Sequence, residues 1–478
     1  MKKIFATISI LLIFINSTIG QDTANISNES NKILPAPKVD RRVELLSIVF
    51  RLAGSYEYNF EYYKSYVKDI HDHFDKFKEH PLIKFAKELH DKNNVCFGDP
   101  MYMAVYLEQP PSLKPIIPFT ADSPNKKWGV NNANKFVSLL QQFYTDANCD
   151  DFFNKHEKVY KTAEYQFKKV YDALDLNWYK EYYGKMPDGK FNILIGLSNG
   201  PCNYGPRIIF PDNKKDIYAI MGTKVDSLGK PEYDVKGHIP TLIHEFNHSF
   251  CNPLIDKNKN QIEKFGKIIF KQVETEMSAQ AYGSWDIMMY EALVRASVIR
   301  YLMKHDTDKT IAEKEINTEF AQGFIWIREL VELLGQYEKK RTNYPTIESF
   351  MPQIISFYQS TAKNIKILKA NYNKKSAHVI SIQQFENKSK NVDPKITEIK
   401  ICFDKTLRGE GSSIFYKNNK NHYPITDFIG YTDDNEAIIL KVALKPNWKY
   451  LFVLTGHEFK TVDGYSLERY VVKFKTRK

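Results

Sequence analysis

Hydrophobic and polar positions follow two different periods along the chain. From Val39 to about Lys92, from about Asn134 to Asp175 and from Ile239 to about Leu368, apolar residues recur every three or four positions, which is the spacing of amphipathic helices. Two short β-branched runs, FNILIGL (191–197) and DIYAIMGT (216–223), flank a loop rich in glycine and proline. This pattern predicts an α+β region that is mostly helical and contains a small sheet.

After Val392 the pattern becomes that of short strands. The runs ITEIKICF, SIFYK, EAIILKVAL, YLFVLTG and YVVKFK are separated by turn residues. Several short strands in so compact a segment are typical of an immunoglobulin-like β-sandwich. We therefore expect two folded regions, residues 39–385 and residues 386–478.

The N-terminus has the pattern of a signal peptide. Lys2 and Lys3 precede an apolar run from Ile4 to Ile15, and small residues follow near Gly20. The run is too short to span a bilayer as a helix, so residues 1–20 are interpreted as a signal peptide, with a membrane anchor as the alternative. Residues 21–38 are rich in Asn, Ser and Pro, which predicts a flexible leader. The mature protein is then expected in the periplasm, on the cell surface or outside the cell, with no membrane span.

Composition narrows the class of protein. The 478 residues are 43% hydrophobic and 26% charged, which excludes a disordered or collagen-like chain. The formal net charge is +11, but no basic helix or base-stacking motif accompanies it, so no nucleic-acid partner is expected. The 5 cysteines are scattered without a CxxC, which argues against a disulfide framework and against a cysteine-based metal site. No feature indicates an oligomeric state.

The run His244-Glu245-Phe246-Asn247-His248 carries the clearest chemistry, an HExxH motif. On a helix, residues four apart share a face, so His244 and His248 can bind one metal ion. Glu245 lies about 100° around the helix, as suits a general base rather than a third ligand. Pro240 fits the first turn of this helix, and Asn252-Pro253 predicts its end.

A catalytic zinc ion needs a third protein ligand and an open fourth position. Glu291 falls in the apolar stripe of a helix predicted over residues 286–305, where a carboxylate is unfavourable unless it is paired or bound to a metal. Glu276 lies beside apolar positions in the same way, so we favour Glu291 and keep Glu276 as the alternative. Arg295, one turn after Glu291, is expected either to pair with that carboxylate or to form a surface ion pair. Further acidic candidates are Asp256, Glu274 and Asp286.

The run TLIHEFNHSF resembles the zinc-binding helix of zincin metallopeptidases, and YEALVRA, with its Glu291, is similar to the later helix of the gluzincin branch. The resemblance implies Zn²⁺ held by His244, His248 and Glu291, with Glu245 as general base. The gap between His248 and Glu291 is longer than in the best-known gluzincins. More broadly, residues 39–370 resemble a poorly characterised family of exported bacterial zincin-like proteins, and the C-terminal part is similar to a bacterial Ig-like domain.

The resemblance also implies an edge strand above the catalytic helix, where an extended peptide adds as a further strand. FNILIGL or DIYAIMGT would supply that edge. Zincins often use a Tyr or His to stabilise the oxyanion, and the candidates by residue type are Tyr204, Tyr282 and Tyr290.

These features predict an exported zinc-dependent peptidase, most simply an endopeptidase, acting on a peptide or protein substrate. The alternative is a non-catalytic binding or adhesion protein on a zinc-stabilised zincin scaffold, although a scaffold has no need of Glu245. A third hypothesis comes from Gly196-Leu197-Ser198-Asn199-Gly200, which fits the GxSxG nucleophile elbow of serine hydrolases. The elbow requires a helix directly after the serine, whereas a loop is predicted here.

Overall fold

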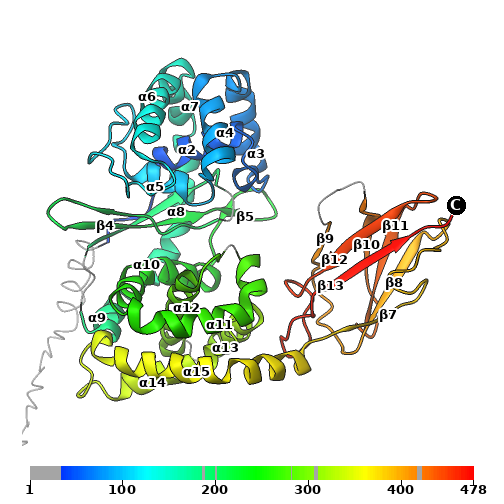
Figure 1. The fold of residues 1–478 in the computed structure, drawn as a ribbon. Coiled ribbons are helices and arrows are strands. Elements are labelled where there is room, and N and C mark those ends of the chain that lie inside the picture. Colours follow the sequence, from blue (N-terminus) through cyan, green and yellow to red (C-terminus); the bar gives the residue numbers. More distant parts are fainter. Residues whose placement is uncertain (1–33, 186–188, 200–201, 281, 306–309, 417–421) are drawn as a thin grey trace, which may run out of the picture. The chain divides into compact units, whose positions relative to one another are not determined.

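The structure is a computed structural model that describes residues 34–185, 189–199, 202–280, 282–305, 310–416 and 422–478 (Figure 1). The predicted signal peptide and most of the predicted leader lie outside these residues. Within the last part of the predicted leader, Leu34 is buried and its carbonyl accepts a hydrogen bond from Tyr171. Among the described residues, we find no helix that is both apolar enough and long enough to span a membrane.

The α+β prediction is confirmed, with a helical part followed by a β region. The described residues form two compact units. The first holds the residues up to Leu176 and those from 189 to Phe246, and the second holds residues 177–185 and all those from Asn247 onward. The helix that carries the HExxH motif runs through the division, so its first part belongs to one unit and its second part to the other.

A four-stranded sheet forms the centre of the first unit, with strand order β1-β2-β4-β3. The strands are β1 (Lys38–Val39), β2 (Lys190–Gly196), β4 (Lys215–Gly222) and β3 (Arg207–Ile209). The first three are parallel, and β3 pairs antiparallel to β4 as an edge strand. Both runs predicted as strands are therefore strands, but the expectation that one of them forms the edge was wrong, because each has a neighbour on both sides.

Most helices of the first unit, α2 to α7, gather on one side of this sheet (Figure 1). The helices of this unit before β2 are α2 (Arg41–Leu52), α3 (Lys64–Phe74), α4 (Pro81–Asn93), α5 (Asp99–Val105), α6 (Val130–Asp146), α7 (Cys149–Lys155) and α8 (Glu157–Asp172). Helix α2 is buried along nearly its whole length, and its first turn is capped by the Asp40 carboxylate, which accepts from the Arg42 amide. The short 3₁₀ turns Tyr56–Tyr58 and Asp75–Phe77 and the ribbon of β5 (Lys224–Val225) and β6 (Pro231–Glu232) complete the unit.

Helices also build the first part of the second unit. They are α9 (Asn177–Tyr183), α11 (Lys259–Ala279), α12 (Trp285–His305), α13 (Thr310–Ala321), α14 (Ile327–Lys339) and α15 (Ile347–Lys375). The predicted helix over 286–305 is confirmed by α12 to within one residue. Helix α15 begins with a capping box, in which Thr346 and Ser349 exchange side-chain and backbone hydrogen bonds. Such a cap fixes where this long helix starts.

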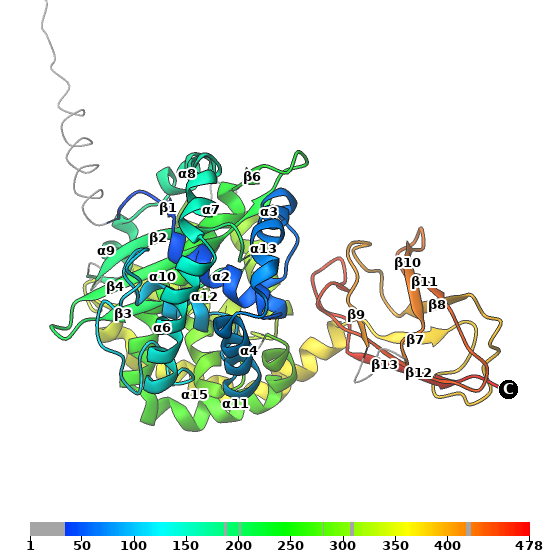
Figure 2. The ribbon, with the colours of Figure 1, turned by 90° about the horizontal axis from the view of Figure 1, so that it is seen from above.

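The C-terminal part is a two-sheet sandwich. One sheet has the order β10-β11-β8-β7 and the other β13-β12-β9, and β12 and β13 lie opposite β10 and β11 in Figure 2. Apolar residues of both sheets, among them Ile401, Leu440 and Phe452, form one core. The strands are β7 (Val379–Ile382), β8 (Glu398–Phe403), β9 (Ile414–Tyr416), β10 (Ile425–Tyr431), β11 (Ala437–Val442), β12 (Lys449–Leu454) and β13 (Tyr470–Lys475).

Five of these strands coincide with the predicted runs, whereas β7 and β10 were missed. Strand β10 contains Asp427 and Gly430 and has two register irregularities against β11, which obscure its alternation. Strand β7 lies before residue 386, where we placed the start of the β region. The five cysteines are all free thiols.

Candidate metal centre

Helix α10 (Val235–Lys257) carries the HExxH motif and is longer than predicted at both ends. It begins before Pro240 because the carboxylate of Asp234 accepts hydrogen bonds from the amides of Lys236 and Gly237, which caps the first turn. It continues past Asn252-Pro253, although proline removes one helical hydrogen bond. The turn after Pro253 buries Leu254 and Ile255, and this packing offsets the missing bond.

Packing fixes the rotation of α10. The ring of Phe246 stacks on Phe191 of β2 with centroids 4.2 Å apart, and Phe250 stacks on Tyr183 with centroids 4.0 Å apart. These rings hold the apolar side of the helix in the protein interior. The two histidines lie on the other side and are partly exposed.

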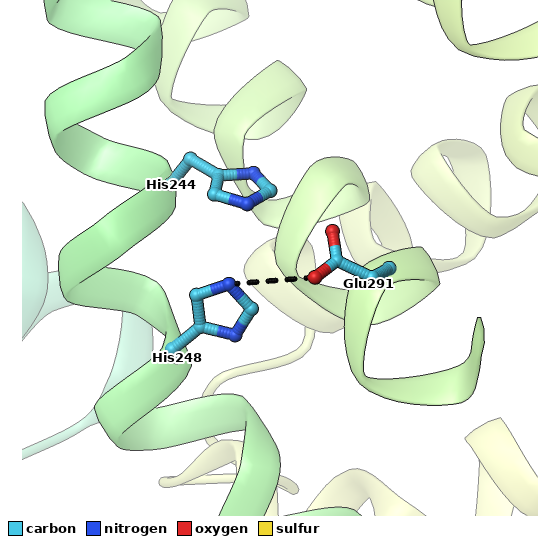
Figure 3. Close-up of side chains that lie close together, drawn as sticks. All are labelled: His244, His248 and Glu291. Carbon is cyan, nitrogen blue, oxygen red and sulfur yellow. Dashed lines mark ion pairs between the residues drawn. The ribbon is translucent and has the colours of Figure 1, made fainter. Parts of the chain in front are cut away.

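His244, His248 and Glu291 lie together, as the sequence predicted. One ligand atom from each falls within 4.8 Å of the other two. Figure 3 shows both imidazoles reaching from α10 toward Glu291 on α12. The Oε1 atom of Glu291 is 3.6 Å from Nε2 of His248. Two imidazole nitrogens and one carboxylate oxygen are the donor set of a catalytic zinc site that keeps a fourth position open.

The outer nitrogen of His248 has a fixed partner. Its Nδ1 atom lies 3.1 Å from Oδ1 of Asn252, one turn along α10. Since an amide oxygen only accepts, Nδ1 carries the proton and Nε2 keeps the lone pair that a metal needs. Metal-binding histidines commonly have such a second hydrogen bond, which sets the ring orientation.

The two oxygens of the Glu291 carboxylate have different neighbours. While Oε1 faces His248, Oε2 accepts hydrogen bonds from the Tyr282 hydroxyl and from Nε of Arg295, both at 3.2 Å. Glu291 is only 7% exposed. Its orientation is therefore set by donors on one oxygen, which leaves the other oxygen to a metal ion.

Arg295 is held in turn by Glu319 of α13. Its Nη1 lies 2.7 and 2.5 Å from the two carboxylate oxygens of Glu319, and Nη2 donates to Tyr282 at 2.7 Å. Burial lowers the pKa of Arg295, but Glu319 and Glu291 outweigh it and hold the pKa well above its usual value. The predicted pairing of Arg295 with Glu291 is confirmed as a buried contact. Glu319 could not be predicted from the sequence, because its position depends on how α13 packs against α12.

Glu245 lies against the backbone of the segment that leads into β3. A Cβ atom added at Gly205 would lie 2.6 Å from Oε2 of Glu245, which is too close for any real side chain. A larger residue at this position would therefore displace either the Glu245 carboxylate or the segment that leads into β3. Gly205 belongs to the glycine- and proline-rich loop that was predicted between the two strands.

The other acidic candidates lie outside this cluster. Glu276 forms an ion pair with Lys369, Asp256 accepts from the Tyr290 hydroxyl, and Asp286 pairs with Lys259 at 3.0 Å. Glu274 is exposed on α11. Among the described residues, the only three-residue group with metal-binding geometry is the one containing Glu291, so the structure favours Glu291 over Glu276.

Neither His238 nor Ser198 belongs to the metal-binding group, and each has a structural role instead. His238, another histidine near the motif, lies in the first turns of α10, where its Nδ1 is 2.8 Å from the Asp234 carbonyl. Ser198 is 1% exposed and donates to the buried carboxylate of Glu44 at 2.8 Å. A bend follows β2 there, not the helix that a nucleophile elbow requires. Ser198 therefore links the end of β2 to Glu44 of α2 and is not accessible to a substrate.

Comparison with known proteins yields one family match and no functional relative. Residues 126–357 match the family described as "Domain of unknown function (DUF4932)", a segment that contains all three clustered residues. No curated protein matches the chain.

Among solved structures, the chain is similar to surface layer protein SbsC, domains 1-6, at 15% identity and a TM-score of 0.17, over 52% of this chain and 34% of that one. The N-terminal part of the bacterial S-layer protein SbsC matches at 12% identity and a TM-score of 0.15, over 50% and 58%. The chain thus spans about a third of the length of the first of these structures. Such low TM-scores carry no inference about fold or function.

Proposed function

We propose that this protein is a zinc-dependent peptidase, with zinc held by His244, His248 and Glu291 and with Glu245 as general base. The observation that carries the proposal is the convergence of the three ligand atoms within 4.8 Å. A buried carboxylate with one oxygen held by Tyr282 and Arg295 and the other facing an imidazole fits a metal ligand better than a structural ion pair.

In this proposal, different residues bind the metal and transfer the proton during peptide hydrolysis. Zinc, when bound, supplies a Lewis acid that acidifies water and polarises the scissile carbonyl. Glu245 accepts the proton of the attacking water and passes it to the leaving amine. Its position next to His244 on α10 keeps the base beside the metal ligands without making it one. Gly205 leaves the space that the carboxylate occupies.

A peptide substrate has an edge strand available. Among the described strands, β3 pairs only with β4, so its other side can take an extended peptide through backbone hydrogen bonds. The segment that enters β3 is the one against Glu245. This arrangement supports an endopeptidase, because backbone pairing does not require a chain end.

The test uses purified protein from Gln21 onward, incubated with a diverse peptide pool beside the Glu245→Gln variant. New termini read by mass spectrometry should appear with the wild type and be absent with Glu245→Gln, while both proteins hold one zinc per chain. Absence of cleavage by zinc-loaded wild type would refute the peptidase and favour the zinc-stabilised binding protein.

Export is part of the proposal and rests on the pattern of residues 1–20. N-terminal sequencing of the protein recovered from its producing cells should begin near Gln21. A mature chain that retains Lys2 and Lys3 would show that the apolar run is not removed.

A further inference from the structure

Arg207 lies in the edge strand β3 and is a partly buried cation. It is intermediate in exposure, and among the described residues no hydrogen bond or ion pair to its guanidinium is present. Asp216, at the neighbouring register position of β4, accepts instead from the Tyr218 hydroxyl at 3.4 Å. Burying part of a guanidinium without a carboxylate is unfavourable, so the position is suited to an external anion.

The groups around Arg207 connect it to the general base. Burial raises the pKa of the Tyr102 phenol on α5, the positive charge of Arg207 lowers that pKa and the negative charge of Glu245 raises it. Burial also raises the pKa of Tyr106, and Arg207 opposes this shift. The pKa of this one phenol is therefore affected by both Arg207 and Glu245.

The register of the edge gives the spacing along a bound peptide. Tyr204 exchanges both backbone hydrogen bonds with Ile220, and the Pro206 carbonyl accepts from Tyr218. In an antiparallel pair only every second residue bonds to the neighbouring strand. Gly205 and Arg207, which alternate with Tyr204 and Pro206, therefore direct their backbone groups to the free side. Their side-chain positions share one face of the strand, about 7 Å apart, and the Gly205 position is the one that touches Glu245.

We propose that Arg207 binds a carboxylate of the substrate within about two residues of the cleaved bond, so that the enzyme selects acidic peptides. The inference rests on the proposed peptidase function and names its substrate class. A guanidinium binds a carboxylate through two parallel hydrogen bonds. The carboxylate is either an Asp or Glu side chain or a peptide C-terminus.

The experiment measures binding apart from turnover. Glu245→Gln protein loaded with zinc is equilibrated with synthetic peptides in which Asp or Glu is exchanged for Asn or Gln, each with a free or an amidated C-terminus. The same set is offered to Glu245→Gln proteins that also carry Arg207→Gln, Arg207→Glu or Lys214→Gln. Lys214 is the matched control, since it is an exposed cation on the same hairpin and pairs with Asp212. Cleavage of the set is then measured with Glu245 restored.

We expect at least a tenfold preference for acidic over amide peptides, lost with Arg207→Gln and kept with Lys214→Gln. Arg207→Glu should prefer peptides with Lys or Arg instead, a gain that misfolding cannot produce. Loss of preference on amidating the C-terminus assigns the carboxylate to the chain end; retention assigns it to a side chain. Equal binding of acidic and amide peptides overturns the inference even if cleavage occurs. Acid-selective, Arg207-dependent binding without cleavage would support the subsite and refute the peptidase.

Discussion

The Oε1 atom of Glu291 lies 3.6 Å from Nε2 of His248, although the two residues are far apart in the sequence and belong to different helices. A carboxylate and an imidazole at this distance, with His244 beside them, can share one ion. The expected properties of the protein follow from this group and from the residues that hold it.

Removing a ligand should remove the metal. Glu291→Gln keeps the size of the side chain but weakens the only anionic ligand of the group, so we expect zinc affinity to fall by at least 100-fold. Glu276→Gln is the control, because Glu276 pairs with Lys369 outside the cluster. Zinc titration of both variants with a competing chelator measures this. Equal loss in the two variants would show that Glu291 is not a ligand.

Arg295 should matter for metal affinity without touching the metal. Arg295→Lys keeps the charge but cannot bond Glu291, Glu319 and Tyr282 together, so we expect zinc affinity to fall about 10–100-fold. The matched control is Arg300→Lys on the same helix, whose guanidinium pairs with Glu338 instead. If both substitutions leave zinc affinity unchanged, the hydrogen bonds to Oε2 of Glu291 do not position the ligand.

Gly205→Ala should impair catalysis while sparing zinc. The added methyl group would meet the Glu245 carboxylate at 2.6 Å, so either the strand or the base must shift. We expect kcat to fall at least tenfold, with one zinc still bound per chain. Gly283→Ala is the comparison, since its Cβ would have no neighbour within 4 Å. Unchanged kcat in Gly205→Ala would contradict the placement of the base.

Glu44 should make the stability of the first unit depend on pH. Burial raises the pKa of Glu44 from 4.5 to about 7, although Leu197 and Ser198 donate to it. The folded chain therefore binds more protons between these values. The contribution of Glu44 to stability is fully present below pH 4.5 and is lost as the pH rises through about 7, by roughly 3 kcal/mol for a shift of this size.

Thermal unfolding of wild type and Glu44→Gln at pH 5 and pH 8 measures this effect. Glutamine cannot titrate, and every other group cancels in the comparison. We expect the midpoint of the wild type to fall relative to that of Glu44→Gln on going from pH 5 to pH 8. A difference that stays constant with pH would mean that Glu44 does not titrate in this range.

The predictable part of the site was the part encoded within one helix. His244 and His248 share a face because of helical periodicity alone, and Glu291 stood out as a carboxylate in an apolar stripe. Arg295 followed from its i+4 spacing to Glu291. Glu319, Tyr102 and Arg207 come from other elements, and only the packing of the chain brings them near the ligands or the base.

For the fold, too, features encoded within one segment were predictable, whereas features that depend on how segments pack were not. Long periodic segments were predicted as helices, and β-branched runs as strands. The order of the strands was not predictable, because β3 is only three residues long and its place at the edge depends on pairing with β4. The ends of α10 were misplaced, because a cap at Asp234 and the burial of Leu254 outweigh the proline signals.

Zinc in the His244, His248 and Glu291 group should drive peptide cleavage. This claim is tested most directly by stripping the purified protein with a chelator and measuring cleavage of an acidic peptide pool as zinc is added back. We predict no cleavage by the stripped protein and a rise to a plateau at one zinc per chain, with no recovery in Glu291→Gln at that ratio. Full activity of the stripped protein, or equal recovery in Glu291→Gln, would contradict the claim.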